Sequence, residues 1–194
     1  MQEKYREICQ KLQVALSKDR FEHSLGVSYT AAALAMAHKF DMEKAFLAGL
    51  LHDCAKHLSL DAMLSLCAEY CEQLPEDHLK SPQVLHAPCG ALLAKYHYGI
   101  SDEEILSAIR LHTTGAAFMS TLDKIIFIAD YIEPSRHKAQ HLALIRETAF
   151  KDLRYTVYLI VKDTVEYLRG KNVYINRNTL ECLKDLEVNG IYDK

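Results

Sequence analysis

Residues 45–53 read Ala-Phe-Leu-Ala-Gly-Leu-Leu-His-Asp, an apolar run that ends in a histidine and an aspartate. An uninterrupted run of this kind predicts a buried helix, so His52 and Asp53 emerge where that helix reaches a cavity rather than open solvent. Burying an imidazole and a carboxylate costs free energy unless something compensates for it, and a bound metal ion does. The stretch therefore predicts a metal centre inside a helical protein.

The rest of the chain repeats the helical pattern. Apolar residues recur with a period of about 3.6, whereas sustained two-residue alternation and hairpin turn signals between apolar strands are missing. We therefore expect an all-α protein, a single-domain helical bundle over residues 1–194. Its motif core covers about 18–136, and C-terminal helices at 141–187 complete the bundle. The expected helices cover about 2–17, 20–39, 42–57, 60–72, 87–98, 102–112, 121–131, 141–169 and 177–187.

Specific residues mark the expected helix ends. Gly99 can adopt the left-handed conformation that ends one helix, and Ser101 with Glu104 forms a capping box that begins the next. Gly170 ends the longest helix in the same way as Gly99. A partly irregular loop is expected between about 73 and 88, where prolines cluster, and it leads into a helix near the last of them. These prolines are Pro75, Pro82 and Pro88.

Composition and charge narrow the class of protein. The chain has 194 residues, of which 49% are hydrophobic and 25% charged, as in an average globular protein with one core. The net charge is -3 and charged residues are interspersed, so we expect no nucleic-acid or membrane partner. No secretion signal or membrane-spanning run is apparent. The six cysteines fall mostly in apolar patterns and are expected to be reduced core residues of a cytoplasmic protein.

Two further helices offer metal-binding side chains. His23 lies in an amphipathic stretch in which Gly26 permits close approach of a neighbouring backbone or ligand. Asp130 ends the apolar run 124–130. Three helices thus each place a ligand at the polar end of an apolar stretch, as helical bundles do when they build metal sites. Two imidazoles and two carboxylates, without a thiolate, suit iron, manganese or zinc better than calcium.

This order of residues, His23, then His52-Asp53, then a distant Asp130, resembles the HD phosphohydrolase superfamily, in which it supplies the metal ligands. The resemblance implies that the bundle is of the HD type, with the metal site in its helical core. A closer resemblance, to the YqeK family, spans nearly the whole chain. Members of that family are symmetrical bis(5′-nucleosyl)-tetraphosphatases, which split diadenosine tetraphosphate into two molecules of ADP, usually with iron. The resemblance implies this activity, a dinucleoside polyphosphate substrate and one or two iron ions, with manganese or another divalent transition metal as the alternative. The matching segments are Arg20–Gly26, Leu50–Lys56, His86–Pro88, His112–Gly115 and Ala129–Arg136.

His86 and His112 are the next candidates. Either they bind a second metal ion, with Asp53 as a bridge because a carboxylate has two oxygens, or they donate hydrogen bonds to substrate phosphates. Lys56 lies one turn beyond His52, so its ammonium group can reach a phosphoryl oxygen or the attacking water. We predict catalytic roles for Asp53 and Lys56.

Substrate-binding candidates surround this centre. Arg20, one turn before His23, and Arg136, in a loop, can each hold a phosphate through two parallel hydrogen bonds. The Thr-Thr-Gly turn at 113–115 can offer hydroxyl and N–H groups to phosphate, and the segment 173–178 can line the base or ribose. The predicted set is Arg20, His23, Gly26, Thr113, Gly115, Arg136, Val173, Tyr174, Ile175, Asn176, Arg177 and Asn178.

The expected chemistry is in-line attack by a metal-bound hydroxide on a phosphorus second from one nucleoside, with ADP as the leaving group. Two alternatives stay open. One is another HD-type nucleotide phosphatase or pyrophosphohydrolase with the same metal core. The other is a non-catalytic, metal-dependent nucleotide sensor. A symmetric homodimer is a reasonable starting assumption for an enzyme of this size.

Overall fold

A computed structural model describes residues 2–74 and 76–192, with only the backbone for residues 2–4. Within these ranges the chain forms eleven α-helices, one short 3-10 helix (η1) and no β-strand, which confirms the all-α prediction. Pro75, one of the prolines of the expected loop, lies outside the described residues. The elements are α1 (Gln2–Ala15), α2 (Lys18–Ala37), α3 (Met42–Leu51), α4 (Leu60–Glu69), α5 (Glu76–Leu79), η1 (Pro82–Val84), α6 (His86–Tyr96), α7 (Glu103–Leu111), α8 (Thr121–Ile132), α9 (Leu142–Ala149), α10 (Leu153–Gly170) and α11 (Arg177–Asn189).

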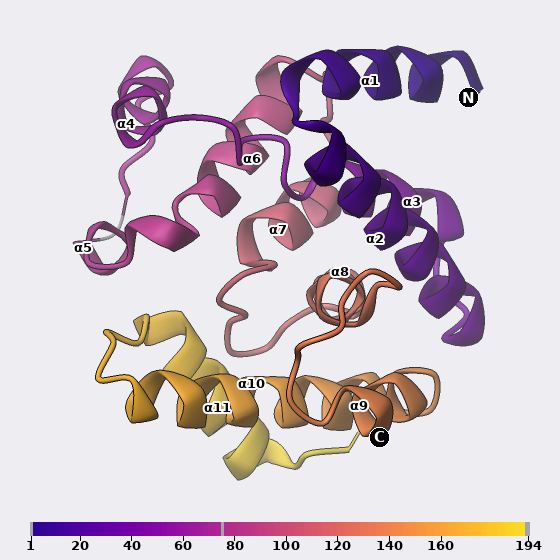
Figure 1. The fold of residues 1–194 in the computed structure, drawn as a ribbon, viewed down its shortest axis with the longest axis vertical. Coiled ribbons are helices and arrows are strands. Elements are labelled where there is room, and N and C mark those ends of the chain that lie inside the picture. Colours follow the sequence, from indigo (N-terminus) through magenta and orange to yellow (C-terminus); the bar gives the residue numbers. More distant parts are fainter. Residues whose placement is uncertain (1, 75, 193–194) are drawn as a thin grey trace.

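The other helices are arranged around α8, which runs through the middle of the molecule (Figure 1). α2, α3 and α7 pack against α8 from one side, and α10 packs against it from the other. Residues 125–129 of α8 are accordingly all buried. A single apolar cluster reaches from α1 to α11, so the C-terminal helices extend the same core that the motif-bearing helices build.

The closest packing joins α2 to α3. A Cβ atom on Gly49 would lie only 2.9 Å from the Cα atom of Ser28, so the two backbones meet where Gly49 has no side chain. Gly49 also precedes His52 by less than one helical turn. The same glycine therefore sets the distance between α2, which carries His23, and the end of α3, which carries His52.

Two helix boundaries differ from the prediction near the site. α7 is capped by Asp102, whose Oδ1 accepts from the backbone N–H groups of Glu104 and Ile105, and not by Ser101. Asp102 is the N-cap because its carboxylate lies one residue nearer than the Ser101 hydroxyl to the first unpaired N–H groups of the helix. The expected left-handed conformation of Gly99 is confirmed by its φ of 66°.

α3 ends at Leu51 instead of continuing to residue 57. The imidazole of His52 donates to the carbonyl oxygen of Gly49, a group that the backbone of Asp53 would otherwise use in a continuing helix. Residues 52–57 form turns, in which the N–H of Cys54 bonds to the carbonyl of Leu51. The expected helix 42–57 is therefore wrong over its last turn and a half, because a side chain replaces the backbone donor.

The expected single helix at 141–169 is also wrong, since α9 and α10 are separate. Asp152 caps α10 by accepting from the N–H of Tyr155, which starts a new helix where the prediction continued the old one. At the other end of α10, Asn172 and not Gly170 adopts the left-handed conformation, with a φ of 51°. Asparagine tolerates this region better than most residues with a side chain.

The proline-containing stretch is partly irregular, as expected, and holds the short elements α5 and η1 before α6 begins at His86. Cys71 departs from the expectation for the cysteines. It is exposed and has a φ of 53°, because it lies in the turn that follows α4 instead of facing the core. Cys54, Cys67, Cys89 and Cys182 are buried as expected.

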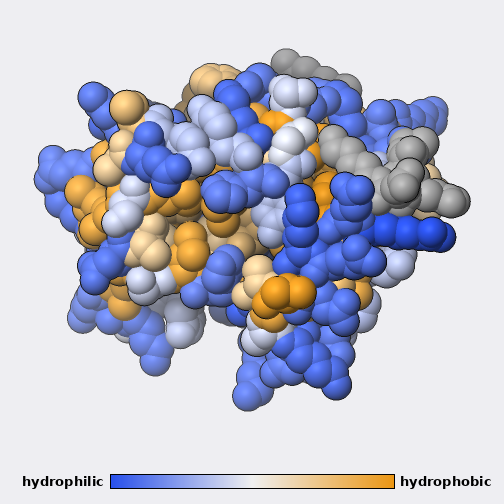
Figure 2. Space-filling view, turned by 90° about the horizontal axis from the view of Figure 1, so that it is seen from above, coloured by the Kyte–Doolittle hydropathy of each residue, from blue (hydrophilic) through white to orange (hydrophobic). Residues whose placement is uncertain are grey.

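None of the described helices is long and apolar enough to cross a membrane. On the face shown in Figure 2, hydrophilic side chains surround smaller patches of apolar ones. This mixture matches the interspersed charges of the sequence.

Candidate metal centre

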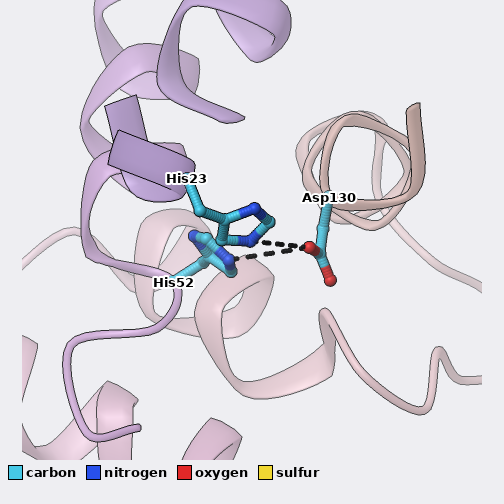
Figure 3. Close-up of side chains that lie close together, drawn as sticks. All are labelled: His23, His52 and Asp130. Atoms are coloured by element: carbon cyan, nitrogen blue, oxygen red, sulfur yellow. Dashed lines mark ion pairs between the residues drawn. The ribbon is translucent and has the colours of Figure 1, made fainter. Parts of the chain in front are cut away.

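Three of the predicted ligands meet between α2, the end of α3 and α8 (Figure 3). The Nε2 atom of His23 lies 3.1 Å from Oδ1 of Asp130, and the Nε2 atom of His52 lies 3.8 Å from the same oxygen. One ligand atom from each of the three residues falls within 4.8 Å of the others. Helices distant in sequence thus bring His23, His52 and Asp130 together around one point.

Asp53 links this trio to the outer histidines. Its Oδ2 faces His52 at 3.5 Å and His23 at 3.9 Å, both measured to Nε2. Its Oδ1 faces the Nε2 atoms of His86 at 3.2 Å and His112 at 3.5 Å. His52, Asp53 and His112 form a second group of ligand atoms within 4.8 Å of one another. The two carboxylate oxygens therefore face two different sets of imidazoles.

Three of these histidines are oriented by their own backbone. In His52, His86 and His112, Nδ1 lies 2.7–2.9 Å from the carbonyl oxygen three residues earlier in the chain. Because a carbonyl can only accept, Nδ1 carries the proton and Nε2 keeps its lone pair. Each lone pair points towards Asp53, the arrangement that a metal ligand requires.

His23 is oriented differently, by a residue that the sequence analysis did not assign. Its Nδ1 lies 3.3 Å from Oε1 of Glu133, which is only 2% exposed. Ser135 holds that carboxylate with its hydroxyl at 2.5 Å and its N–H at 2.7 Å. A Cβ on Gly26 would lie 3.0 Å from Oε2 of Glu133, so the predicted close approach at Gly26 is made by this side chain. A signal was present, since Glu133 follows Asp130 by about one helical turn.

The segment that carries Glu133 is anchored by another unassigned residue. Arg146, on α9, donates to the backbone carbonyls of Ile132, Glu133 and Arg136 at 2.9–3.0 Å. One guanidinium group thus holds the turn that follows α8. A sequence pattern cannot reveal this contact, because the acceptors are backbone atoms.

The donor set fits a divalent transition metal. The buried Nε2 atoms of His23 and His52 and the buried Oδ1 of Asp53 have no hydrogen-bond partner, which costs free energy unless a cation binds there. Nitrogen and oxygen donors without sulfur suit metals such as iron, manganese or zinc. A site built from His23, His52, Asp53 and Asp130 is therefore chemically consistent with the predicted ligand set.

The protonation states support the same conclusion. Burial lowers the pKa of His52 to about 4, so its imidazole is neutral at pH 7 and able to donate a lone pair. Burial opposes ionisation of Asp53, but the imidazoles of His52, His112 and His86 that surround it favour the ionised carboxylate and hold the pKa of this carboxyl well below its usual range. For Asp130, burial is likewise outweighed, chiefly by the imidazole of His23 beside its Oδ1, and its pKa is lowered. The centre therefore presents ionised carboxylates beside a neutral imidazole.

A cleft of about 590 Å³ opens onto His23. The predicted phosphate ligands Arg20 and Arg136 both line it and both contact the centre. Nη1 of Arg20 lies 2.6 Å from Oδ2 of Asp53, and Nη2 of Arg136 lies 3.3 Å from Oδ1 of Asp130. Each guanidinium group is partly exposed, so it can contact a ligand in the cleft while it remains beside a carboxylate. The other lining residues are Ser17, Asp19, Glu133, Ser135, His137 and Lys138.

Lys56 lies beside the outer histidines. Its Nζ is 3.1 Å from both ring nitrogens of His86. Burial of the ammonium group, opposed by the charge of Asp53, lowers the pKa of Lys56. The lysine therefore lies on the side of Asp53 that faces His86 and His112, which the helical spacing from His52 did not indicate.

The Thr-Thr-Gly turn follows directly after His112, and it makes contacts with α11. Thr113 follows His112 and has a buried hydroxyl without a hydrogen-bond partner. Gly115 instead faces α11, where an added Cβ would meet Sγ of Cys182 at 3.2 Å. The carbonyl of Thr114 accepts from the hydroxyl of Thr179, also on α11. The turn thus connects the centre to the start of α11.

The segment 173–178 lies against α5. The hydroxyl of Tyr174 and the backbone N–H of Arg177 both donate to the carboxylate of Asp77. Arg177 and Asn178 line a hollow of about 450 Å³, and the four predicted metal ligands are not among its lining residues. The other residues that line it are Glu76, Asp77, His78, Lys80 and Glu181. A nucleotide-binding role for Val173, Tyr174, Ile175, Asn176, Arg177 and Asn178 stays a prediction.

The fold and the centre define a class of protein. The HD domain family matches residues 20–135, a range that contains all four predicted metal ligands. The chain belongs to the HD domain family.

Individual proteins with similar sequences or structures define the relationship more closely. A Staphylococcus aureus (strain NCTC 8325 / PS 47) protein named symmetrical bis(5'-nucleosyl)-tetraphosphatase is 40% identical over 171 residues, 87% of each chain. A Bacillus subtilis (strain 168) protein of the same name is 38% identical over 160 residues, 81% of this chain and 83% of its own. A crystal structure of a predicted HD superfamily hydrolase involved in NAD metabolism, from Clostridium acetobutylicum, matches with a TM-score of 0.92 at 38% identity. The match covers 95% of this chain and 97% of that one. The resemblance seen in the motif segments is thereby confirmed.

Proposed function

We propose that this protein is a metal-dependent symmetrical bis(5′-nucleosyl)-tetraphosphatase that hydrolyses diadenosine tetraphosphate to two molecules of ADP. The observation that carries the proposal is that relatives at 38–40% identity, matched over most of both chains, bear this name. The buried histidine and aspartate cluster beside a cleft with two arginines supports it, because phosphoryl transfer depends on positioning and on neutralising charge.

A divalent cation held by His23, His52, Asp53 and Asp130 would act as a Lewis acid on phosphoryl oxygens and lower the pKa of water. In this proposal Arg20 and Arg136 bind non-bridging phosphate oxygens. Their guanidinium groups are partly exposed and lie beside Asp53 and Asp130, so a phosphate bound to them would lie next to the candidate metal ligands. In the proposed reaction, water adds to one of the two central phosphorus atoms and the central P–O–P bond breaks. The bridging oxygen leaves with the other ADP.

The outer histidines and Lys56 complete the proposed machinery. His86 and His112 would either hold a second cation together with Asp53 or, when protonated at Nε2, donate to substrate phosphates. Lys56, beside His86, neutralises charge that develops on the departing ADP. Thr113, Gly115 and the segment 173–178 are the proposed contacts for one ADP half.

The resident metal is proposed to be iron, as one or two ions, with manganese or another divalent transition metal as the alternative. Metal analysis of protein purified without added chelator measures both the identity and the number of ions. Two ions per chain support the bridging arrangement at Asp53, whereas one ion assigns His86 and His112 to the phosphates.

Product identification tests the activity. Protein loaded with iron or manganese is incubated with diadenosine tetraphosphate, and the products are separated by chromatography. ADP as the sole nucleotide product is expected. Products of ATP and AMP, or an intact substrate, would overturn the symmetrical assignment. Inert protein that still binds ADP would instead identify a nucleotide sensor, and cleavage of other nucleotides only would identify a different HD-type phosphohydrolase.

The proposed setting is the cytoplasm, where the free thiols stay reduced. The proposed assembly is a symmetric homodimer. Light scattering on the purified protein measures the assembly, and a monomer over the working concentration range would exclude the dimer.

A further inference from the structure

A second hollow adjoins the cleft of the metal centre. It measures about 410 Å³ and lies between the end of α8, residues 136–140 and α10. Arg136 and Lys138 line both this hollow and the cleft, so the two spaces are neighbours. We call it the tyrosine hollow, and its lining residues are Tyr131, Arg136, Lys138, Asp163, Thr164 and Tyr167 together with Ala139 and Gln140.

Aromatic side chains from two helices contribute to this hollow. Tyr131 comes from α8 and is half-buried, with its hydroxyl 3.3 Å from the carbonyl oxygen of Gln140. Tyr167 comes from α10 and is 60% exposed. Nζ of Lys171 lies over this ring, 6.0 Å from its centre, but a ring that borders a hollow and remains this exposed still offers a stacking surface.

The hollow also has a hydrogen-bond acceptor. Asp163 is buried, and its two carboxylate oxygens lie 3.0–3.1 Å from Nδ1 of His141. A carboxylate has more acceptor positions than one imidazole can fill, so Asp163 can still accept from hydroxyl or amino groups of a ligand. Ribose hydroxyls and exocyclic amines of bases are groups of this kind.

Basic side chains lead from the hollow to the metal centre. Arg136 contacts Asp130 through Nη2, and its buried Nε has no hydrogen-bond partner. Lys138 lines both spaces. A chain of phosphates that passes these two residues would be neutralised along its path from the hollow to the ligand cluster.

We propose that the tyrosine hollow binds one of the two nucleosides of the substrate. The base stacks on Tyr167, the ribose or amino groups face Asp163, and the phosphates pass Arg136 and Lys138 to reach Asp130. This inference rests on the proposed function and adds to it, because a dinucleoside tetraphosphate has two nucleosides and the segment 173–178 accounts for only one of them.

The test removes the stacking ring. Tyr167→Ala is expected to raise the KM for diadenosine tetraphosphate roughly 5- to 150-fold, the range that corresponds to the loss of one base–aromatic stack. Tyr167→Phe keeps the ring and is expected to retain the wild-type KM. The matched control is Tyr192→Ala, since Tyr192 is also 60% exposed but does not line the hollow. Inhibition by inorganic tripolyphosphate, which has no base, is expected to be unchanged in all three variants.

A second variant fills the hollow instead of removing a residue from it. Thr164→Trp places a large side chain in the hollow without altering a residue of the cleft, and it is expected to raise the same KM. Circular dichroism melting curves establish that each variant is folded. An unchanged KM in both Tyr167→Ala and Thr164→Trp would overturn the inference, and so would an equal defect in Tyr167→Phe and Tyr167→Ala.

A binding measurement separates this inference from the proposed function. The fluorescent analogue 1,N6-etheno-ADP is titrated into the metal-loaded protein and its Kd is measured. If the wild type binds the analogue but does not hydrolyse diadenosine tetraphosphate, the proposed function fails, while weaker binding by Tyr167→Ala still supports the hollow. If the wild type hydrolyses the substrate symmetrically and the Tyr167 variants match it in KM and Kd, the hollow is overturned and the function stands.

Discussion

His52 and His23 face the same carboxylates but are held in place by different means. Nδ1 of His52 donates to a carbonyl three residues earlier in its own chain segment, and His112 and His86 repeat this arrangement. His23 lies within α2, and its Nδ1 is paired with Glu133, a residue 110 positions away. One side of the centre is therefore oriented by local backbone. The other side depends on how the turn after α8 docks against α2, so it can be disturbed without any change to a ligand.

Asp53 faces the imidazoles on both sides of the centre, so its substitution should have the largest effect on activity. Asp53→Asn keeps the shape of the side chain but removes the charge that faces both sets of imidazoles. We expect kcat to fall by about a thousand-fold or more, because several kcal/mol of metal-dependent stabilisation is lost. Steady-state kinetics and metal analysis on the same preparation measure both effects. Asp102→Asn, at the cap of α7, is the control, and a comparable loss there would show that the effect is not specific to the centre.

Glu133→Gln tests the side of the centre that carries His23, without changing the side that carries His52. The amide removes the negative charge beside Nδ1 of His23 while preserving the size of the side chain. We expect metal affinity to fall by about 10- to 100-fold, the usual effect of altering a residue that orients a metal-binding histidine. Competition with a chelating dye measures the affinity. Wild-type affinity in Glu133→Gln would show that α2 alone positions His23, and the contrast between the two sides would disappear.

Arg146→Lys tests whether the turn after α8 must be held in place for Glu133 to orient His23. The lysine cannot reproduce the three hydrogen bonds that hold the turn after α8. We expect a loss of unfolding free energy of about 2 kcal/mol and a roughly tenfold lower metal affinity. Urea denaturation and chelator competition measure these quantities, with Arg169→Lys on the exposed end of α10 as the control. Reduced stability with unchanged metal affinity would mean that the turn does not control His23.

A buried histidine outside the centre separates the effect of burial from that of ligation. Burial of His78, opposed by the charge of Asp77, lowers its pKa from 6.5, so the folded state binds this proton less readily than the unfolded state. Stability should therefore be complete above about pH 6.5 and decline as the pH falls below it.

Urea midpoints at about pH 7.5 and about pH 5.5 measure this decline, and His78→Asn should show a smaller change than the wild type. An identical pH dependence in the two proteins would assign the decline to other groups. The effect is expected to be the smallest of the four, since it arises from a single side chain remote from the ligands.

The candidate ligands and most of the fold could be predicted from the sequence because their signals are local. Apolar periodicity predicted the helices, and His52, Asp53 and Asp130 were recognised because each ends an apolar run. The same reasoning failed where a side chain competes with the backbone. The imidazole of His52 shortens α3, and Asp152 divides the expected helix at 141–169 into α9 and α10.

The sequence by itself therefore determined the class of fold, and from residue type, spacing and the family resemblance it predicted the four metal ligands and the outer pair His86 and His112. Only the tertiary structure decided how the centre is supported. Glu133 behind His23, Arg146 on the carbonyls of the turn, and Lys56 beside His86 rather than His52 are contacts between distant segments. Such contacts follow from how helices pack against one another, and the packing is not encoded in the periodicity of any single helix.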